Sequence, residues 1–287
     1  MSMSESNPKD VRSWSGPIEH MDEDERRALI DSMTAEERPR IAITDALHNN
    51  WFEIWYQPKI DLKRKCLAGA EALARIHHPQ LGILLPGSFL PDVDEESIGE
   101  LAQHALLATL CDWTMFEEAG FNLHLAINVP AGVLFRMPIV ELVAEYRPKS
   151  PHWPGLIIEV TEDQIVRDIA LANEVTAQLR GSGISIAIDD FGAGYSGLSL
   201  LTEFQPRIVK LDMLLIRDID RNPVRLAIVR GVLSMCRELG ILVIAEGVES
   251  VAEYRVLEGL GVALFQGFLF ARPAFEELPA VHFPAGQ

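Results

Sequence analysis

From about residue 50 onward, the chain alternates short apolar runs of strand character with amphipathic stretches of helical length. The helical stretches include LANEVTAQLRGSG and NPVRLAIVRGVLSMCRELG, and the apolar runs are FEIWYQPKI, CLAGAEAL, LHLAINV, GLIIEVTE, ISIAIDD, RIVKLD, ILVIAEGV and ALFQGFLF. Strands that alternate with helices favour a largely parallel sheet. Eight strands in about 235 residues match the usual size of a (β/α)₈ barrel. The pattern therefore predicts an α/β fold, a modified TIM-type barrel, over residues 40–287.

The first two apolar runs differ from the others, because only DLKRK separates them. A crossover helix between parallel strands needs about a dozen residues or more. We therefore expect residues 52–60 and 66–73 to pair as an antiparallel hairpin, which gives the barrel an antiparallel first strand. Residues 1–39 are polar and irregular, and we expect them to form an N-terminal extension that is partly helical or disordered.

The net charge of −17 at pH 7 limits the classes of partner. A general DNA- or RNA-binding protein needs a basic surface to displace counterions from phosphates, so we expect no nucleic-acid partner. The negative charge is still compatible with a small phosphorylated ligand, because bound metal ions invert the local electrostatics. No apolar stretch approaches the roughly 20 residues of a membrane span. Three cysteines without metal-binding spacing are typical of reduced thiols, and we expect a cytoplasmic protein.

Polar or charged side chains stand at the carboxyl end of nearly every predicted strand. In a barrel these strand ends meet at one face, which is the face where active sites form. A single acid at such a place is more often a helix cap or a surface residue, but the repetition from strand to strand favours a shared site. The residues are Glu71, Asn128, Glu159, Asp189, Asp190, Lys210, Asp212, Glu246, Glu249 and Gln266.

Oxygen-donor side chains without histidine or cysteine suit a hard cation such as Mg²⁺ or Mn²⁺. Several carboxylates in one cavity would repel one another strongly unless cations neutralised them. Because these acids exceed the number of ligands that one ion needs, we expect two ions, about 3.5–4 Å apart, that clamp a phosphoryl group.

Asp189 and Asp190 are adjacent, although successive side chains of a regular strand point to opposite faces. Gly192 and Gly194 follow directly, and glycine tolerates the backbone conformations of a turn. We therefore expect a turn that brings both carboxylates to one site, with Asp189 bridging two ions and Asp190 binding the second. The alternative is an ordinary turn rich in Asp and Gly.

At these positions the sequence resembles the EAL-domain family of cyclic di-GMP phosphodiesterases, over about residues 40–275. The triplet that names the family is present as Glu71-Ala72-Leu73. The motifs HPQLGILLPGSFLP, INVP, IEVTE, DDFGAGYSGL, VKLD, AEGVES and QGFLFARP follow in the family's order. The resemblance implies a barrel with an antiparallel first strand, and hydrolysis of one phosphodiester bond of cyclic di-GMP to give linear pGpG.

The resemblance also implies roles for individual residues. Two Mg²⁺ or Mn²⁺ ions would be bound, with Ca²⁺ inhibitory, and Lys210 would orient the attacking water and stabilise charge in the transition state. Glu249 would belong to the catalytic residues and Asp212 to the substrate-binding residues. Both would position Lys210 and the neighbouring loops. Glu162 would anchor the DDFGAGYSG loop. The first ion would be bound by Glu71, Asn128, Glu159 and Asp189, the second by Asp189, Asp190 and Glu246, and the substrate by Gln57, Leu73, Arg75, Asp212 and Gln266.

Alternative roles stay open for two of these residues: Arg75 could pair with a surface acid, and Gln57 could be a strand-end hydrogen bonder. Ile76 stands where the family usually has tryptophan, and Ala193 replaces a common threonine. We expect these two departures to affect the rate of the reaction rather than its nature.

Two other functions would explain part of the sequence. A catalytically weak receptor for cyclic di-GMP that signals to a protein partner would be expected to lack a metal ligand or Lys210, which this chain has. A metal-dependent barrel enzyme of another class would explain the acids but not the ordered motifs. The apolar helix VRLAIVRGVLSMC suits a homodimer interface, although packing on the barrel explains it equally well.

Overall fold

The computed structural model describes residues 39–194, 197–275 and 281. The predictions made for residues 1–38 lie outside this part of the chain, as do Tyr195 and Ser196 of the DDFGAGYSGL motif. The chain divides into a smaller compact unit, with residues up to Ile54 and Ala74–His104, and a larger one, with Trp55–Leu73 and the residues from Ala105 onward. No described helix is long and apolar enough to cross a membrane.

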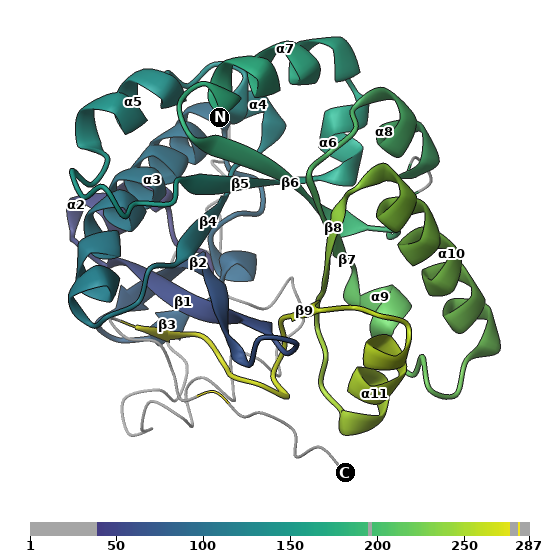
Figure 1. Ribbon diagram of the computed structural model, residues 1–287. Helices are drawn as coiled ribbons and strands as arrows, with labels where there is room; N and C mark the ends of the chain where they lie inside the picture. Colours follow the sequence, from purple (N-terminus) through teal and green to yellow (C-terminus); the bar gives the residue numbers. More distant parts are fainter. Residues whose placement is uncertain (1–38, 195–196, 276–280, 282–287) are drawn as a thin grey trace, which may run out of the picture. The chain divides into compact units, whose positions relative to one another are not determined.

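The larger unit contains most of a closed ring of eight strands, and residues 52–54 and 74–78 of these strands belong to the smaller unit (Figure 1). Around the ring the order is β1, β9, β8, β7, β6, β5, β4 and β2, and the pairing of β1 with β2 closes it. Neighbours from β2 round to β9 are parallel, whereas β1 is antiparallel to β9. The predicted barrel with an antiparallel first strand is thus confirmed. The bounds are β1 (Phe52–Asp61), β2 (Cys66–His78), β4 (His124–Asn128), β5 (Leu156–Thr161), β6 (Ile184–Phe191), β7 (Ile208–Leu211), β8 (Leu242–Ala245) and β9 (Leu264–Phe265).

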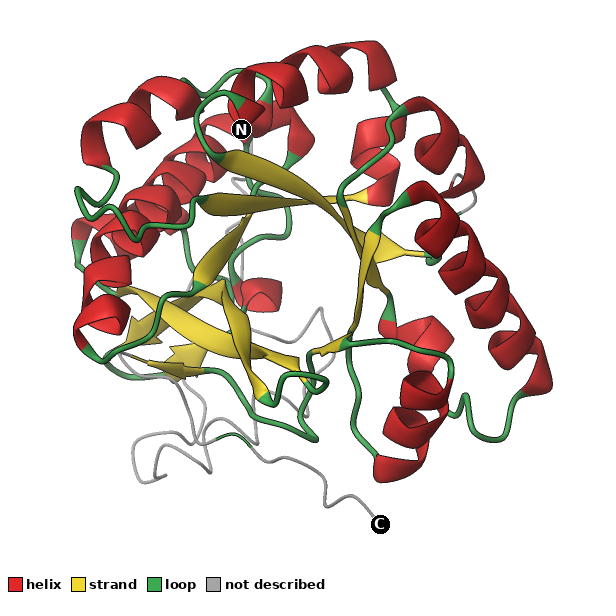
Figure 2. Cartoon of the chain, viewed as in Figure 1, coloured by secondary structure: helices red, strands yellow, loops and turns green. Residues whose placement is uncertain are grey.

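The helices of the larger unit connect these strands, and α5, α7, α8, α10 and α11 lie around the outside of the ring (Figure 2). Local sequence signals fix their ends, as α10 shows. Asn222 caps it by accepting hydrogen bonds from Val224 N and Arg225 N, and Gly240 ends it with a φ of 70°. The helix α3 (Glu95–Glu118) begins in the smaller unit and continues into the larger one. The other helices are α4 (Ala131–Leu134), α5 (Ile139–Tyr146), α6 (Glu162–Val166), α7 (Ile169–Arg180), α8 (Gly197–Glu203), α9 (Met213–Ile216), α10 (Pro223–Leu239) and α11 (Val251–Gly259).

Alternation along the strands separates the packing residues from the residues of the site. Because side chains alternate between the two faces of a strand, Glu159, Asp189 and Lys210 share one face with each other, while their neighbours point outward to the helices. These outward neighbours are almost fully buried: Ile158, Val160, Ile188, Val209 and Leu211. The apolar layer between strands and helices therefore packs directly behind the strand ends that carry the site residues.

The smaller unit has its own apolar core. It contains α2 (Ile43–His48), β3 (Gly82–Leu84) and the 3₁₀ turn η3 (Pro86–Ser88), and β3 pairs antiparallel with residues 76–78 of β2. Ile76, at the position where the resemblance implies a tryptophan, is fully buried there. The core residues are Ile41, Ile43, Ala46, Ile76, Leu81, Leu84, Phe89 and Leu101.

His78 is buried in this smaller unit at 5% exposure. Its Nδ1 accepts hydrogen bonds from Gln80 N and Leu81 N, both at 3.2 Å, and its ring meets the Trp51 ring edge to face. These contacts require the neutral form of the ring with its proton on Nε2. Exposed His77, by contrast, has its Nδ1 2.9 Å from Glu53 Oε1.

Candidate active site

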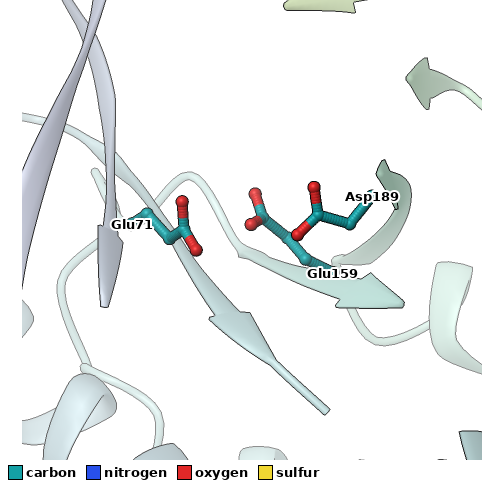
Figure 3. A group of neighbouring side chains, drawn as sticks. All are labelled: Glu71, Glu159 and Asp189. Carbon is teal, nitrogen blue, oxygen red and sulfur yellow. The ribbon is translucent and has the colours of Figure 1, made fainter. Parts of the chain in front are cut away.

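Three carboxylates from three strands converge inside the ring. Glu71 comes from β2, Glu159 from β5 and Asp189 from β6, and one oxygen of each lies within 4.8 Å of the others. Figure 3 shows the three side chains directed toward one another. Glu71 and Glu159 are buried, and 13% of the Asp189 side chain is exposed. The strand register places them together, because Glu159 and Thr161 of β5 pair with residues that precede and include Asp189.

Lys210 of β7 lies among these acids and is only 1% exposed. Its Nζ is 3.3 Å from Glu71 Oε2 and 3.1 Å from Asp189 Oδ1, and it forms a close ion pair with Glu159 Oε2. A fourth carboxylate, that of Glu246 directly after β8, places Oε1 2.7 Å from the same nitrogen. Residues spread over most of the chain therefore form one charged cluster.

A bulge in β6 shapes the Asp189-Asp190 pair. The pairing of β6 with β7 shifts register between Ile188 and Phe191, and Asp190 has a φ of 53°. A bulge turns a strand locally and redirects its side chains. Gly192 follows with a φ of 96°, and a Cβ there would lie 2.4 Å from Leu215 Cδ1, so this position requires glycine. The positive φ that the sequence led us to expect at glycine is thus shared by Asp190 itself.

Amide side chains surround Glu71. Asn128 Nδ2 donates to Glu71 Oε1 at 2.6 Å, and Gln266 Nε2 donates to Glu71 Oε2 at 2.6 Å and to Gln57 Oε1 at 3.1 Å. Gln57 Nε2 donates in turn to Ala271 O at 3.4 Å. The Gln266 amide must point its nitrogen at these two acceptors, which leaves Oε1 buried without a hydrogen-bond partner among the described residues.

Asp212 and Glu162 hold the loops beside the cluster. Asp212 caps α9 by accepting from Leu214 N at 2.6 Å, and its side chain also forms a hydrogen bond with Asp190. Glu162 Oε2 accepts from Gly192 N at 3.0 Å. A loop-positioning role for Asp212 and Glu162 stays a prediction.

Three predicted site residues are not placed in the cluster by these contacts. Glu249 has an exposed side chain, and its backbone N donates to Glu253 Oε2 at 3.1 Å. Leu73 is half-buried on β2. Arg75 belongs to the smaller unit, where its Nη1 donates to Ala74 O at 2.8 Å. Contacts of Leu73 and Arg75 with a substrate stay predictions.

Lys59 of β1 belongs to the cluster although the sequence reasoning missed it. It is 3% exposed, and its Nζ forms a close ion pair with Glu159 Oε1. A signal was present, because Lys59 follows Gln57 by two positions and so lies on the same face of the strand. A lysine within an otherwise apolar strand is rarely buried unless it is paired.

The electrostatics of Glu71 follow from these partners. Burial by itself raises the pKa of a carboxyl group. The ammonium groups of Lys210 and Lys59, together with the hydrogen bonds from Asn128 and Gln266, outweigh burial and lower the pKa of Glu71 to about 2. Glu71 is therefore a carboxylate throughout the physiological pH range.

Other acids of the cluster shift in the opposite direction. Burial, with the neighbouring carboxylates Asp189 and Asp212, raises the pKa of Asp190 to about 6. Burial likewise raises the pKa of Glu246 well above its ordinary value, against the attraction of Lys210. Repulsion from the neighbouring Asp189 carboxylate adds to the rise at both groups, and a bound cation would relieve this repulsion.

The donor set fits a divalent metal ion of the hard class. The converging ligands are carboxylate oxygens, and an amide side chain lies beside them at Asn128. Oxygen ligands select Mg²⁺, Mn²⁺ or Ca²⁺ over the softer metals that prefer cysteine or histidine. The ligand oxygens of Glu71, Glu159 and Asp189 are already close enough to share one ion.

Comparison with known proteins gives consistent relatives. The sequence model of the family described as EAL domain matches residues 40–273. The chain is 36% identical to the uncharacterised protein Rv1354c of Mycobacterium tuberculosis over 222 residues, which cover 76% of this chain and 36% of that protein. It is 34% identical to the cyclic di-GMP phosphodiesterase RocR of Pseudomonas aeruginosa over 262 residues, which cover 90% of this chain and 66% of that protein.

A solved structure of Klebsiella pneumoniae BlrP1 in a complex with manganese and cyclic di-GMP also matches. Its TM-score is 0.70 at 33% identity, and the match covers 80% of this chain and 58% of that one. This chain thus spans about a third of the length of the mycobacterial relative and somewhat more than half of the Klebsiella protein. The family match extends over the whole barrel and over every acid of the cluster, and the chain belongs to the EAL domain family.

Proposed function

We propose that this chain hydrolyses one phosphodiester bond of cyclic di-GMP to give linear pGpG, with the help of two divalent cations, Mg²⁺ or Mn²⁺. The observation that carries the proposal is the cluster of Glu71, Glu159, Asp189 and Glu246 around Lys210. Relatives named as cyclic di-GMP phosphodiesterases, and a solved relative that contains manganese and cyclic di-GMP, support the choice of substrate and metal.

Different residues of the cluster would bind the two cations. Glu71, Asn128, Glu159 and Asp189 would hold the first cation, and Asp189, Asp190 and Glu246 the second. Bound cations would polarise the phosphodiester and lower the pKa of the attacking water. Ca²⁺, which accepts looser and larger coordination than Mg²⁺, is expected to inhibit.

Lys210 supplies a fixed positive charge beside the acids. Because it is almost fully buried, its ammonium group stabilises negative charge that develops on the phosphodiester more strongly than it would in water. Gln266 contributes Oε1 as an unused acceptor for an N–H group of the substrate, while its Nε2 keeps Glu71 and Gln57 in place. The carboxyls of Asp212 and Glu162 keep the adjacent loops in position.

The test is to incubate the purified chain with cyclic di-GMP in Mg²⁺, Mn²⁺, Ca²⁺ or EDTA and to separate the nucleotides by chromatography. We expect pGpG with Mg²⁺ or Mn²⁺ and none with EDTA. Glu71→Ala should lower the rate by about 100-fold or more, because even the partners of metal ligands are worth 10–100-fold. Glu174→Ala, at an exposed position of α7, is the matched control and should keep the parent rate.

Intact nucleotide in every metal would contradict the proposal. If the chain nevertheless bound cyclic di-GMP, it would be a receptor, and Ile76→Trp and Ala193→Thr would be the first changes to examine. A cytoplasmic location belongs to the same proposal and is supported by three free cysteines, Cys66, Cys111 and Cys236.

We also propose that the chain forms a homodimer through an apolar surface on α9 and α10, which are in contact with each other. This helix surface consists of Leu214, Val224 and Ile228, whose exposures are 56%, 66% and 46%. The opposite face of α10 is buried, so packing on the barrel does not use these side chains. Exposed apolar surface of this kind is typical of protein–protein contacts.

A further inference from the structure

Glu159 has a different buried cation on each of its two oxygens. Oε2 pairs with Lys210 of β7, whose ammonium also contacts Glu71 and Asp189. Oε1 pairs with Lys59 of β1. The carboxyl group is therefore held at both oxygens, by Lys210 at Oε2 and by Lys59 at Oε1.

Lys59 reaches Glu159 across the interior of the barrel. Its strand β1 and the strand β5 of Glu159 are not neighbours, since β2 and β4 separate them on one side of the ring. Both side chains are nearly inaccessible to solvent, at 3% and 1% exposure. Burying an ammonium group in a protein interior is costly unless it is paired. A lysine kept at such a place needs a reason beyond packing.

We propose that Lys59 is a positioning residue of the active site, which holds Oε1 of Glu159 and so fixes the orientation in which this carboxylate would bind a divalent cation. The inference rests on the metal site of the proposed function and assigns a residue to it. Without Lys59, the Glu159 carboxyl group keeps its ion pair with Lys210 at Oε2 but loses the partner that fixes Oε1, so the carboxyl group can rotate about its last side-chain bonds. Partners of metal ligands act in this way, by orienting the ligand and by completing its hydrogen bonds.

A positioning role and a simple charge role predict opposite signs for metal affinity. If Lys59 only added positive charge, its removal would make the site more negative and would tighten the binding of a divalent cation. If Lys59 positions Glu159, its removal should weaken binding despite the more negative charge. The sign of the change in affinity therefore distinguishes the two roles.

The experiment measures Mn²⁺ binding to the whole chain by electron paramagnetic resonance, without substrate. Lys59→Met removes the ammonium group and keeps the apolar stem, and we expect about 10–100-fold weaker Mn²⁺ binding. Lys59→Gln retains one N–H donor for Oε1 and should bind more tightly than Lys59→Met. Tyr56→Phe is the matched control. Tyr56 lies on the same strand as Lys59 but outside the cluster, and the change removes its hydrogen bond to Asp112 of α3. This variant should bind Mn²⁺ as the parent does.

The same variants are then made in a Glu159→Gln background. If Lys59 acts through the Glu159 carboxylate, the loss caused by Lys59→Met or Lys59→Gln should disappear there. Should Lys59→Met not fold, as judged by circular dichroism, the comparison of Lys59→Gln in the two backgrounds still decides the question.

Three results would overturn the proposal. Two of them would exclude only the role of Lys59, and the third would also exclude the metal site. Equal or tighter Mn²⁺ binding by Lys59→Met, with a parent that binds, would remove the positioning role and leave the metal site intact. An equal loss in both backgrounds would show that Lys59 acts on another group. No Mn²⁺ binding by the parent chain would remove the metal site, and with it both this inference and the proposed function.

Discussion

His78 is a histidine that its surroundings keep neutral. Burial lowers its pKa below the ordinary value, and its Nδ1 is occupied by the backbone N–H groups of Gln80 and Leu81. Because the folded-state pKa is lower than the unfolded-state pKa, the unfolded chain takes up a proton first as the pH falls. The contribution of His78 to stability is therefore complete above the unfolded pKa, at about 6.5, and declines below it.

This difference predicts a specific loss of stability in mild acid. Between about pH 7.5 and about pH 5.5, the free energy of unfolding should fall more in the parent chain than in His78→Gln, whose amide does not titrate. Urea denaturation at both pH values measures the difference. His48→Gln, at an exposed position, serves as control and should follow the parent. Parallel losses in the parent and in His78→Gln would show that His78 is not responsible.

Residues of the site could be predicted from the sequence where a polar residue both ends a predicted strand and belongs to a motif. Residues without both signals were harder to predict. Glu71, Glu159, Asp189 and Lys210 come together as expected, because the barrel brings its strand ends to one face. Lys59 was missed, since a lone basic residue between apolar neighbours carries no motif. Its partner lies 100 residues away in the chain, and no local pattern reports a pair of that separation.

At the scale of elements, the N-terminus of α11 links two loops. Ser250 and Glu253 form a capping box there. The Glu253 carboxylate accepts hydrogen bonds from Asp218 N at 3.1 Å, Glu249 N at 3.1 Å and Ser250 N at 3.0 Å. Burial favours the neutral acid, but these N–H groups outweigh it and lower the pKa of Glu253. One side chain thus joins the turn after α9 to the loop that carries Glu246.

Removing this carboxylate should destabilise the chain. We expect Glu253→Ala to lower the free energy of unfolding by about 2–3 kcal/mol, since hydrogen bonds to a charged group and a helix cap are lost together. Glu253→Gln should lose less, because its amide oxygen still accepts. Urea denaturation at neutral pH tests both, with exposed Glu238→Ala expected within about 0.5 kcal/mol of the parent. A Glu253→Ala variant as stable as that control would contradict the assignment.

The major strands followed from hydrophobic pattern, whereas the short ones did not. The eight apolar runs correspond to the eight strands of the ring, although β9 occupies only two residues of its run. The continuation of β2 to His78, with β3 and with β10 (Ala274–Phe275), was not predicted. Strands of two or three residues show no period, and their pairing depends on neighbours that only the folded chain supplies.

At the scale of the whole molecule, the exposed helix surface of Leu214, Val224 and Ile228 predicts self-association. Light scattering coupled to size-exclusion chromatography should give the mass of a dimer for the parent chain. Ile228→Glu should give the mass of a monomer, because a charge at the centre of an apolar contact is costly to desolvate. Exposed Glu174→Gln is the control and should remain dimeric. A monomeric parent at about 100 μM, a concentration well above typical micromolar affinities, would refute the interface.

The class of the fold was within reach of the sequence, but the division of the chain was not. Strands and helices in alternation predict a barrel from topology alone, and the short DLKRK connection predicts its antiparallel beginning. The smaller compact unit draws residues from both sides of the first two strands. Its core depends on contacts between segments on either side of that hairpin, which hydrophobic periodicity does not report.

A ring of strands that closes on itself leaves few backbone N–H and C=O groups for a strand of another molecule. The described strands outside the ring are β3 and β10, of three and two residues. Marginal strands this short are poor templates for the growth of a β-sheet from one molecule into the next. At high concentration this barrel should therefore resist the edge-to-edge aggregation that turns open sheets into fibres, and copies of the chain should contact one another through their helices.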